Sequence, residues 1–485
     1  MTDTTRQTHT VEKIGGTSMS RLRELRDTLL IGTRKPADLY NRVFVVSAFG
    51  GITNLLLEHK KSGEPGVYAS FANDDTAHRW HDQLDRVAEA MKEAHAAILD
   101  HKADLLEADR FVDERIHGAR GCLIDLQRLC AYGHFRLDQH MGQTRELLSG
   151  LGEAHSAFST TLLLQRAGVN ARFVDLSGWR DEGNASLDER IRDAFAGIDP
   201  ASEMPIVTGY AQCAEGLMGE YDRGYSEVTF SRLAALTQAR EAIIHKEFHL
   251  SSCDPNLVGA DAVRKLGRTN HDVADQLSNL GMEAIHPKAA KTLRQAGVPL
   301  RVTNAFEPDD PGTLIDDLPA DSAAVEIVTG LDIVSLEVFE QDMVGVKGYD
   351  AAILDVLARH NVRIVSKVSN ANTITHYLDG SLKTLRRVEK DLATLYPAAE
   401  ITTRRLSLVA AVGRDLSGLS VLTRGLQAIA AAGLEAIGAT QGPRNVDVQF
   451  ILDRDDMEPA IRALHGALIE KPQAQNAPPA LSHAA

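Results

Sequence analysis

The chain contains little cysteine and few aromatic residues, and it has no run of about 18 consecutive apolar residues. Four cysteines in 485 residues are too few for a disulfide framework, and their spacing matches no zinc or redox motif. We therefore expect reduced, mostly buried thiols in a cytoplasmic protein. The missing apolar run excludes a membrane span. The polar segment Met1 to Glu12 lacks the apolar stretch of a secretory signal.

Basic residues are also fewer than acidic ones. Lys and Arg number 52 against 67 Asp and Glu, for a formal net charge of −15. This excess repels nucleic acid and anionic lipid, so neither is an expected partner. The composition, 44% hydrophobic and 25% charged, is ordinary for a globular protein. The length predicts two or three folding units.

The N-terminal part of the chain shows a strand, a glycine turn and a helix twice within about fifty residues. Val11 to Ile14 precedes Gly15-Gly16, and the apolar run of residues 42–47 precedes Gly50-Gly51. This order predicts parallel strands with helical crossovers, hence an α/β fold with a mainly parallel sheet. Residues 74–149 are charged and helix-periodic, and they are interpreted as a helical insertion.

The C-terminal part repeats itself. Strand, loop, helix, strand, strand and helix follow one another twice, and Gly348 and Gly418 are expected to open the first helix of each copy. The repeat predicts two βαββαβ units, at residues 326–398 and 402–470. The Pro-, Gln- and Ala-containing tail, 471–485, is expected to be disordered.

The first chemical motif is Lys13-Ile14-Gly15-Gly16-Thr17-Ser18. Glycines at a strand end let backbone N–H groups approach an anion, and the following helix start adds the positive end of a dipole. Lys13 would bring a full charge to a transferring phosphoryl group. The alternative is an ordinary glycine turn with a solvated lysine.

The second motif, residues 45–54, brings two hydroxyls, those of Ser47 and Thr53, to another strand end. Such hydroxyls can hold a carboxylate or a phosphate. The alternative is that Thr53 is only the N-cap of a helix. Because ligands bind at the carboxyl ends of parallel strands, two such loops on neighbouring strands support each other.

These motifs resemble those of the aspartokinase family. Lys13 to Ser18 is similar to its Lys-Phe-Gly-Gly-Thr-Ser signature, residues 152–156 to Gly-Glu-x-x-Ser, and 285–287 to its Ile-His-Pro. The C-terminal repeats resemble ACT domains, and the resemblance covers residues 9–470. It implies a three-layer αβα amino-acid-kinase domain at 9–318 and two ferredoxin-like units. Departures from the family pattern resemble a subgroup associated with ectoine biosynthesis.

The resemblance implies transfer of the γ-phosphoryl group of MgATP to the β-carboxylate of L-aspartate, which gives 4-phospho-L-aspartate and ADP. An ionised carboxylate needs no general base. Catalysis then consists of positioning and of charge stabilisation by cations, Mg²⁺ included. Two alternatives remain open: a kinase of this fold acting on glutamate, and a catalytically inactive ACT-containing regulatory protein.

The resemblance also implies roles for individual residues. Lys13, Gly16 and Arg223 would be catalytic, and Glu153 would pair with the substrate ammonium unless it is an exposed helix-start glutamate. Arg223 would hold the substrate α-carboxylate. The implied substrate-binding residues are Ser47, Thr53, Glu153, Arg223 and Glu227. The implied ATP-binding residues are Lys13, Gly15, Gly16, Ser18, Lys246, Ser251, Asp254 and Glu283.

The nucleotide loop, residues 245–256, departs most from the family pattern. Lys246 stands where the family has an acid, and Glu283 stands where it has a lysine. We hypothesise one charge swap, with the two side chains paired across the nucleotide site. The alternative is two unrelated surface changes in a site that has lost its affinity for ATP.

ACT units pair side by side and bind amino-acid effectors at the seam. The implied effector residues are Met343, Gly345, Asp350, Val368, Asn370 and Asn372. Residues 369–372 read Ser-Asn-Ala-Asn, where the family carries Ser-Thr-Ser-Glu. The missing acid predicts weak or absent inhibition by lysine. The alternative is a module that serves dimerisation only, and a homodimer or larger homo-oligomer is expected.

Overall fold

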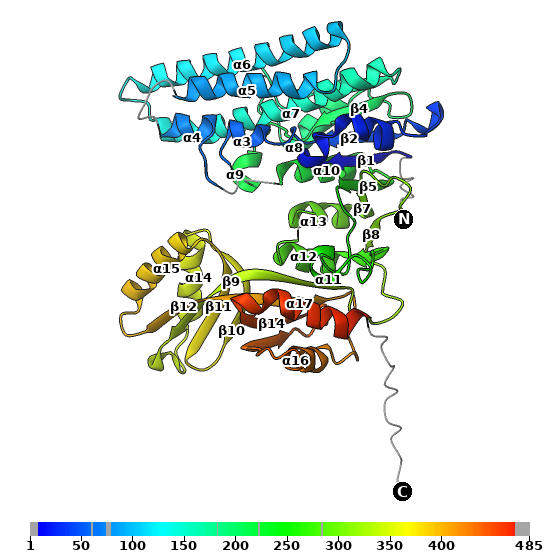
Figure 1. Cartoon of the computed structure of the whole chain (residues 1–485). Coiled ribbons are helices and arrows are strands. Elements are labelled where there is room, and N and C mark those ends of the chain that lie inside the picture. Colours follow the sequence, from blue (N-terminus) through cyan, green and yellow to red (C-terminus); the bar gives the residue numbers. More distant parts are fainter. Residues whose placement is uncertain are drawn as a thin grey trace, which may run out of the picture. The chain divides into compact units, whose positions relative to one another are not determined.

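The computed structural model describes residues 8–59, 62–73, 79–181, 183–221, 224–282 and 285–470. These residues divide into two compact units (Figure 1). The first unit contains 8–250 and 285–317, and the second contains 251–282 and 318–470. Within the described ranges, no helix is both long enough and apolar enough to cross a membrane.

The first unit is built on a sheet in the order β3-β4-β2-β1-β5-β7-β8. All neighbours are parallel except β7 and β8. Strands β1, β2 and β4 are buried along their whole length, as expected for parallel strands covered on both faces. The strands are β1 (Thr10–Ile14), β2 (Arg42–Val46), β3 (Ala171–Val174), β4 (Met204–Thr208), β5 (Glu241–Lys246), β7 (Leu300–Asn304) and β8 (Thr313–Asp316).

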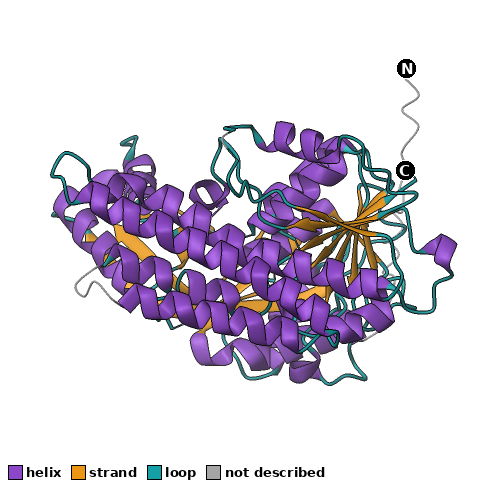
Figure 2. Ribbon diagram, turned by 90° about the horizontal axis from the view of Figure 1, so that it is seen from above, coloured by secondary structure: helices purple, strands orange, loops and turns teal. Residues whose placement is uncertain are grey.

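Helices of the first unit flank these strands (Figure 2). The longest ones, α5 (Arg79–Ala96), α6 (Lys102–Cys130) and α7 (Met141–Arg166), pack side by side. The others are α1 (Gly16–Met19), α2 (Leu22–Leu25), η1 (Arg26–Leu30), η2 (Pro36–Asp38), α3 (Ile52–Leu56), α4 (Val67–Ala72), η3 (Leu137–His140), α8 (Leu187–Phe195), α9 (Leu217–Tyr221), α10 (Tyr225–Leu236) and α13 (Pro287–Ala296).

The second unit contains an antiparallel sheet in the order β10-β11-β9-β12-β14-β13. The strands of this sheet are β9 (Ile327–Phe339), β10 (Arg363–Ser369), β11 (Thr373–Asp379), β12 (Glu400–Val412), β13 (Gly438–Gln441) and β14 (Asp447–Asp453). The short strand β6 (Arg268–Asn270) also belongs to the second unit but lies outside this sheet. Its helices are α11 (Pro255–Val258), α12 (His271–Asn279), η4 (Gln341–Met343), α14 (Tyr349–Arg359), α15 (Leu382–Leu395), α16 (Val421–Ala431), η5 (Arg454–Asp456), α17 (Met457–His465) and η6 (Gly466–Glu470).

The two sequence repeats share their long strands. β9 and β12 pair over 13 residues each, but β11 pairs only with residues 334–339 of β9, and β14 only with 406–412 of β12. Each repeat therefore completes its four-stranded sheet with half of the other repeat's strand. Two separate hydrophobic clusters, one around Ile353 and one around Phe450, correspond to the two repeats.

The predicted α/β class, with a mainly parallel sheet followed by two βαββαβ repeats, is confirmed. One detail differs. Gly348 caps α14 with φ 104°, as predicted, whereas α16 begins only at Val421 with Ser420 as its N-cap. The expected tail at 471–485 lies outside the described residues.

Candidate active site

The candidate site forms where β4, β2, β1 and β5 end, because these four strands are neighbours in the sheet. The glycine loops after β1 and β2 touch each other. A Cβ atom at Gly16 would lie 2.8 Å from the carbonyl oxygen of Ala48, closer than such a contact allows. Glycine is therefore required at this position to bring the two loops together.

Two lysines share one buried carboxylate at this edge. The Nζ atom of Lys13 lies 3.5 Å from Oε1 of Glu227, and Nζ of Lys246 lies 3.9 Å from the same oxygen. The backbone N–H of His286 donates to the other oxygen of Glu227 at 2.5 Å. Burial alone would raise the pKa of Glu227, but the two ammonium groups and this N–H hold that pKa below its usual value. Lys13 is only 8% exposed, so the interpretation as a solvated lysine is wrong.

Glu153 is a second buried carboxylate, 3% exposed, in the middle of α7. The interpretation as an exposed helix-start glutamate is therefore wrong. Burial raises the pKa of Glu153 to about 8, although the charge of Lys13 and a hydrogen bond with Tyr225 oppose this. Its Oε2 atom has no hydrogen-bond partner among the described residues. A side chain at Gly209, just after β4, would collide with that oxygen.

Ser47 and Thr53 are positioned by different contacts. The hydroxyl of Ser47 lies 3.2 Å from that of Ser226, and Ser156 on α7 donates to the Ser47 carbonyl at 2.8 Å. Thr53 lies inside α3, whose N-cap is Gly51 with φ 88°. The alternative that Thr53 is the N-cap is therefore wrong.

The end of the first motif is held by a further contact. Ser18 is fully buried and donates to Oε1 of Glu247, the residue after β5, at 2.5 Å. Gly15 is the N-cap of α1, a helix of only four residues. Local N–H groups rather than a long helix dipole are thus available to an anion here.

Four of the implied residues are not placed at this edge by the described structure. Ser251 and Asp254 belong to the second unit, where Asp254 caps α11 by accepting from the Asn256 N–H. Arg223 and Glu283 lie outside the described residues. Pairing of Lys246 with Glu283 therefore stays a hypothesis, and the carboxylate found beside Lys246 is Glu227.

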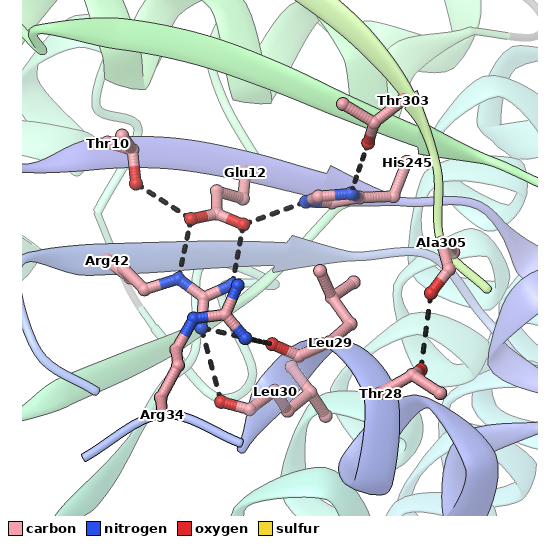
Figure 3. A network of polar contacts seen from close by, with 10 residues as sticks. All are labelled: Thr10, Glu12, Thr28, Leu29, Leu30, Arg34, Arg42, His245, Thr303 and Ala305. Atoms are coloured by element: carbon pink, nitrogen blue, oxygen red, sulfur yellow. Dashed lines mark hydrogen bonds and ion pairs between the residues drawn. The ribbon is translucent and has the colours of Figure 1, made fainter. Parts of the chain in front are cut away.

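A buried polar network crosses the strands that carry these residues (Figure 3). Arg42 binds Glu12 through two hydrogen bonds of 2.8 and 2.9 Å, and His245 lies 2.8 Å from the same carboxylate. The other nitrogen of His245 contacts Thr303 at 2.7 Å. Burial would raise the pKa of Glu12, but Arg42 and His245 hold it well below its usual value. The network fixes β2, β1, β5 and β7 relative to one another, next to the site.

A second chain of polar contacts starts at His155 on α7, two residues after Glu153. His155 on α7 contacts His95 at 3.1 Å, and His95 contacts Asp109 at 3.1 Å. The ring of Phe49, in the second glycine loop, packs against His155 with centroids 5.3 Å apart. Burial lowers the pKa of His155 to about 3, so the ring is neutral near neutral pH and ties α7 to the loop.

One group in the first unit has donor atoms suited to a metal. Those of His249, Glu307 and Asp310 lie within 4.8 Å of one another. His249 already contacts Glu307 at 2.9 Å and Asp310 at 3.7 Å, so the group is also satisfied as an ion-pair cluster. We assign it no role in the reaction.

The implied effector residues lie in the second unit. Asp350, in the first turn of α14, accepts from Lys367 at 2.6 Å and lies 3.5 Å from the buried ring of His376. The amide of Asn370 caps the turn between β10 and β11 by accepting from the backbone of Asn372 at 3.1 Å. Met343 is buried, and Gly345 has φ 79°; Val368 is exposed on β10.

Sequence reasoning missed several residues that the fold brings to the site. Ser226 precedes the implied residue Glu227, and His286 lies in the motif at 285–287, but their contacts depend on α10 and α13 meeting the strand ends. Gly209 directly follows the buried run of β4. This position at a strand end could have marked it as a site residue. The four cysteines are free, but Cys122 is exposed, so the expected burial holds only for Cys213 and Cys253.

A mainly parallel sheet with lysines and glycines at the ends of its strands is typical of α/β enzymes that bind anionic substrates. Residues 9–304 match the family model described as the amino acid kinase family. The chain is 52% identical over 464 residues to aspartate kinase Ask_Ect of Stutzerimonas stutzeri, covering 95% of this chain and 98% of that protein. It is 25% identical to chloroplastic aspartokinase 3 of Arabidopsis thaliana, over 95% of this chain and 81% of that one.

The fold is also found in E. coli aspartokinase III, solved in complex with lysine and aspartate. That structure matches with a TM-score of 0.72 and 19% identity, over 95% of this chain and all of the other. The chain therefore belongs to the amino acid kinase family and, within it, to the aspartate kinases. The expected likeness to the ectoine-associated subgroup is supported by the relative named Ask_Ect.

Proposed function

We propose that the protein is an aspartate kinase, which phosphorylates the β-carboxylate of L-aspartate with MgATP to give 4-phospho-L-aspartate and ADP. The observation that carries the proposal is the pair of lysines around Glu227 beside the buried, incompletely bonded Glu153. The 52% identity to a named aspartate kinase supports the choice of substrate. Residues 9–318 would be the catalytic domain, and 326–470 the regulatory units.

The reaction must bring two anions together. Lys13 and Lys246 offset the charge of the phosphates, and N–H groups of the loop at Gly15 and Gly16 donate to them. Magnesium, which enters with ATP, would neutralise further phosphate charge. The aspartate carboxylate attacks in its ionised form, so the chain supplies positioning rather than a base.

Glu153 would receive the substrate ammonium. Its Oε2 atom is buried and has no hydrogen-bond partner within the part of the chain that the structure describes, and an ammonium group would satisfy it. Ser47 and Thr53 would hold a carboxylate of the substrate. Arg223 is proposed for the α-carboxylate on the resemblance alone.

The test is ATP-dependent formation of aspartyl hydroxamate, with glutamate as the competing substrate. We expect Lys13→Ala to lower turnover by about two orders of magnitude or more. Lys291→Ala, which removes an exposed lysine on α13, is the matched control and should leave the rate unchanged. Equal rates in both variants would contradict the role of Lys13, and a preference for glutamate would contradict the substrate.

We further propose a cytoplasmic homodimer or larger homo-oligomer that feeds the aspartate-derived or ectoine pathway. Asp350 in the effector region is already paired with Lys367, which agrees with weak or absent inhibition by lysine. Hydroxamate formation at rising lysine concentration checks this, and strong inhibition below about 1 mM would refute it.

A further inference from the structure

A second cavity in the first unit is separate from the strand-end site. It lies between α6, α7 and the loop after β3, and its volume is about 210 Å³. Since a water molecule occupies about 30 Å³, this is room for about seven waters or for one small organic molecule. Neither the reaction nor the effector region uses it.

Three side chains that line the cavity, those of Arg115, Trp179 and Arg180, can only donate hydrogen bonds. Arg115 is 8% exposed and uses two of its five N–H groups, bonding Asp175 at 2.6 Å and Ser177 at 3.1 Å. The indole N–H of Trp179 is buried and has no acceptor among the described residues. Arg180 at the rim is ion-paired with Glu114, with Nη1 and Oε1 3.6 Å apart, and none of the residues that line the cavity is acidic. A buried donor without an acceptor is unfavourable, so an acceptor brought by a ligand would be favourable.

The remaining walls are apolar and flat. Leu147 and Leu151 of α7 line one side, and the Trp179 ring lies against α6 at Gly118. A Cβ atom at Gly118 would stand 2.6 Å from that ring, so this glycine allows the indole to lie flush with the helix. The Arg115 guanidinium covers the same ring at 4.7 Å.

We propose that this cavity binds a small carboxylate with a flat apolar body. The carboxylate would accept from the Trp179 and Arg115 N–H groups, and the body would pack between the indole and the two leucines. The inference goes beyond the proposed kinase function and does not depend on it. It has one consequence for that function: α7 also carries Glu153, so an occupied cavity should change the KM for aspartate more than kcat.

Benzoate is the probe, and neutral benzamide of the same shape is its control. The chain has two tryptophans, and Trp80 is fully buried, so a saturable fluorescence change reports on Trp179. We expect saturation by benzoate in the millimolar range, a response to benzamide at least about tenfold weaker, and no response in Trp179→Phe. A linear response to benzoate, or equal binding of benzamide, would overturn the proposal.

Gly118→Ala and Gly121→Ala test the geometry on one helix. Alanine raises helix propensity equally at both positions, but only at Gly118 would the new methyl displace the indole, since nothing lies within 4 Å of a Cβ at Gly121. Benzoate affinity should fall at least about tenfold in the first variant, because the added methyl group shifts the indole that the ligand would contact, and stay unchanged in the second. Equal affinities would reject the assigned cavity.

Alkylation gives a measurement that needs no variant. Cys122 lines the cavity and is exposed, whereas Cys130 lies further along α6 and does not line it. Benzoate should slow the reaction of iodoacetamide with Cys122, read by peptide mass spectrometry, and leave Cys130 unaffected. Equal rates at Cys122 with and without saturating benzoate would count against the site even if fluorescence changes.

Discussion

Glu153→Gln should make the first unit more stable at alkaline pH, because the side chain keeps its shape and loses its charge. Burial raises the pKa of Glu153 from 4.5 to about 8, which corresponds to about 5 kcal/mol as an upper figure, at ~1.36 kcal/mol for each unit. A carboxyl whose folded pKa is raised loses stability as pH increases from its unfolded to its folded pKa. The wild type should therefore lose several kcal/mol between about pH 4.5 and pH 8, and the variant should not.

Urea denaturation at a series of pH values, followed by tryptophan fluorescence, measures this difference. Both tryptophans, Trp80 and Trp179, lie in the first unit, so the signal reports on the unit that contains Glu153. The free-energy difference between variant and wild type should be near zero at low pH and grow to a plateau above pH 8. A difference that does not change with pH would refute the argument that the buried carboxyl is protonated.

The same reasoning predicts proton release when aspartate binds. At about pH 7, a carboxyl of pKa 8 is about nine-tenths protonated, whereas pairing with an ammonium group requires its ionised form. Calorimetric titration of wild type with aspartate in two buffers of different ionisation enthalpy should show close to one proton released. Glu153→Gln should release none. Identical enthalpies in the two buffers for wild type would contradict ammonium binding at Glu153.

Two further outcomes follow from the geometry. Gly209→Ala should raise the KM for aspartate about tenfold or more, because its methyl group would collide with Glu153 Oε2. The control Gly219→Ala should leave this KM unchanged, since nothing lies within 4 Å of its new methyl group. Equal KM values in the two variants would show that the loop at Gly209 moves to accept the methyl group. Acidification from about pH 6.5 to 3 should destabilise the wild type relative to His155→Gln. Burial lowers the pKa of His155 to about 3 in the folded state, so the histidine of the unfolded chain takes up a proton at higher pH than that of the folded chain. Parallel curves of unfolding free energy against pH for the two proteins would contradict this.

Much of the fold follows from local sequence. The apolar runs of β2 and β4 are buried on both faces, and each is followed by a glycine, which is why strand ends and turns could be predicted. The burial of Glu153 could not. Helix-periodic sequence alone does not show that α7 runs unbroken from Met141 to Arg166 or which of its faces meets the sheet. Glu153, which was expected near the start of a helix, therefore lies in the buried middle of α7.

The least predictable feature is the carboxylate that lies beside both Lys246 and Lys13. Comparing motifs along the chain suggests Glu283, because each of the two residues departs from the family pattern in the opposite sense. The sheet order instead places β5 next to β1, so Lys246 and Lys13 leave adjacent strands on the same side, and Glu227 in the first turn of α10 lies between them. Three charged side chains from distant parts of the sequence, Lys13, Glu227 and Lys246, thus form one group. Two ammonium groups around one buried carboxylate would suit this edge of the sheet to a polyanionic nucleotide, and the hypothesis that Lys246 also pairs with Glu283 stays open.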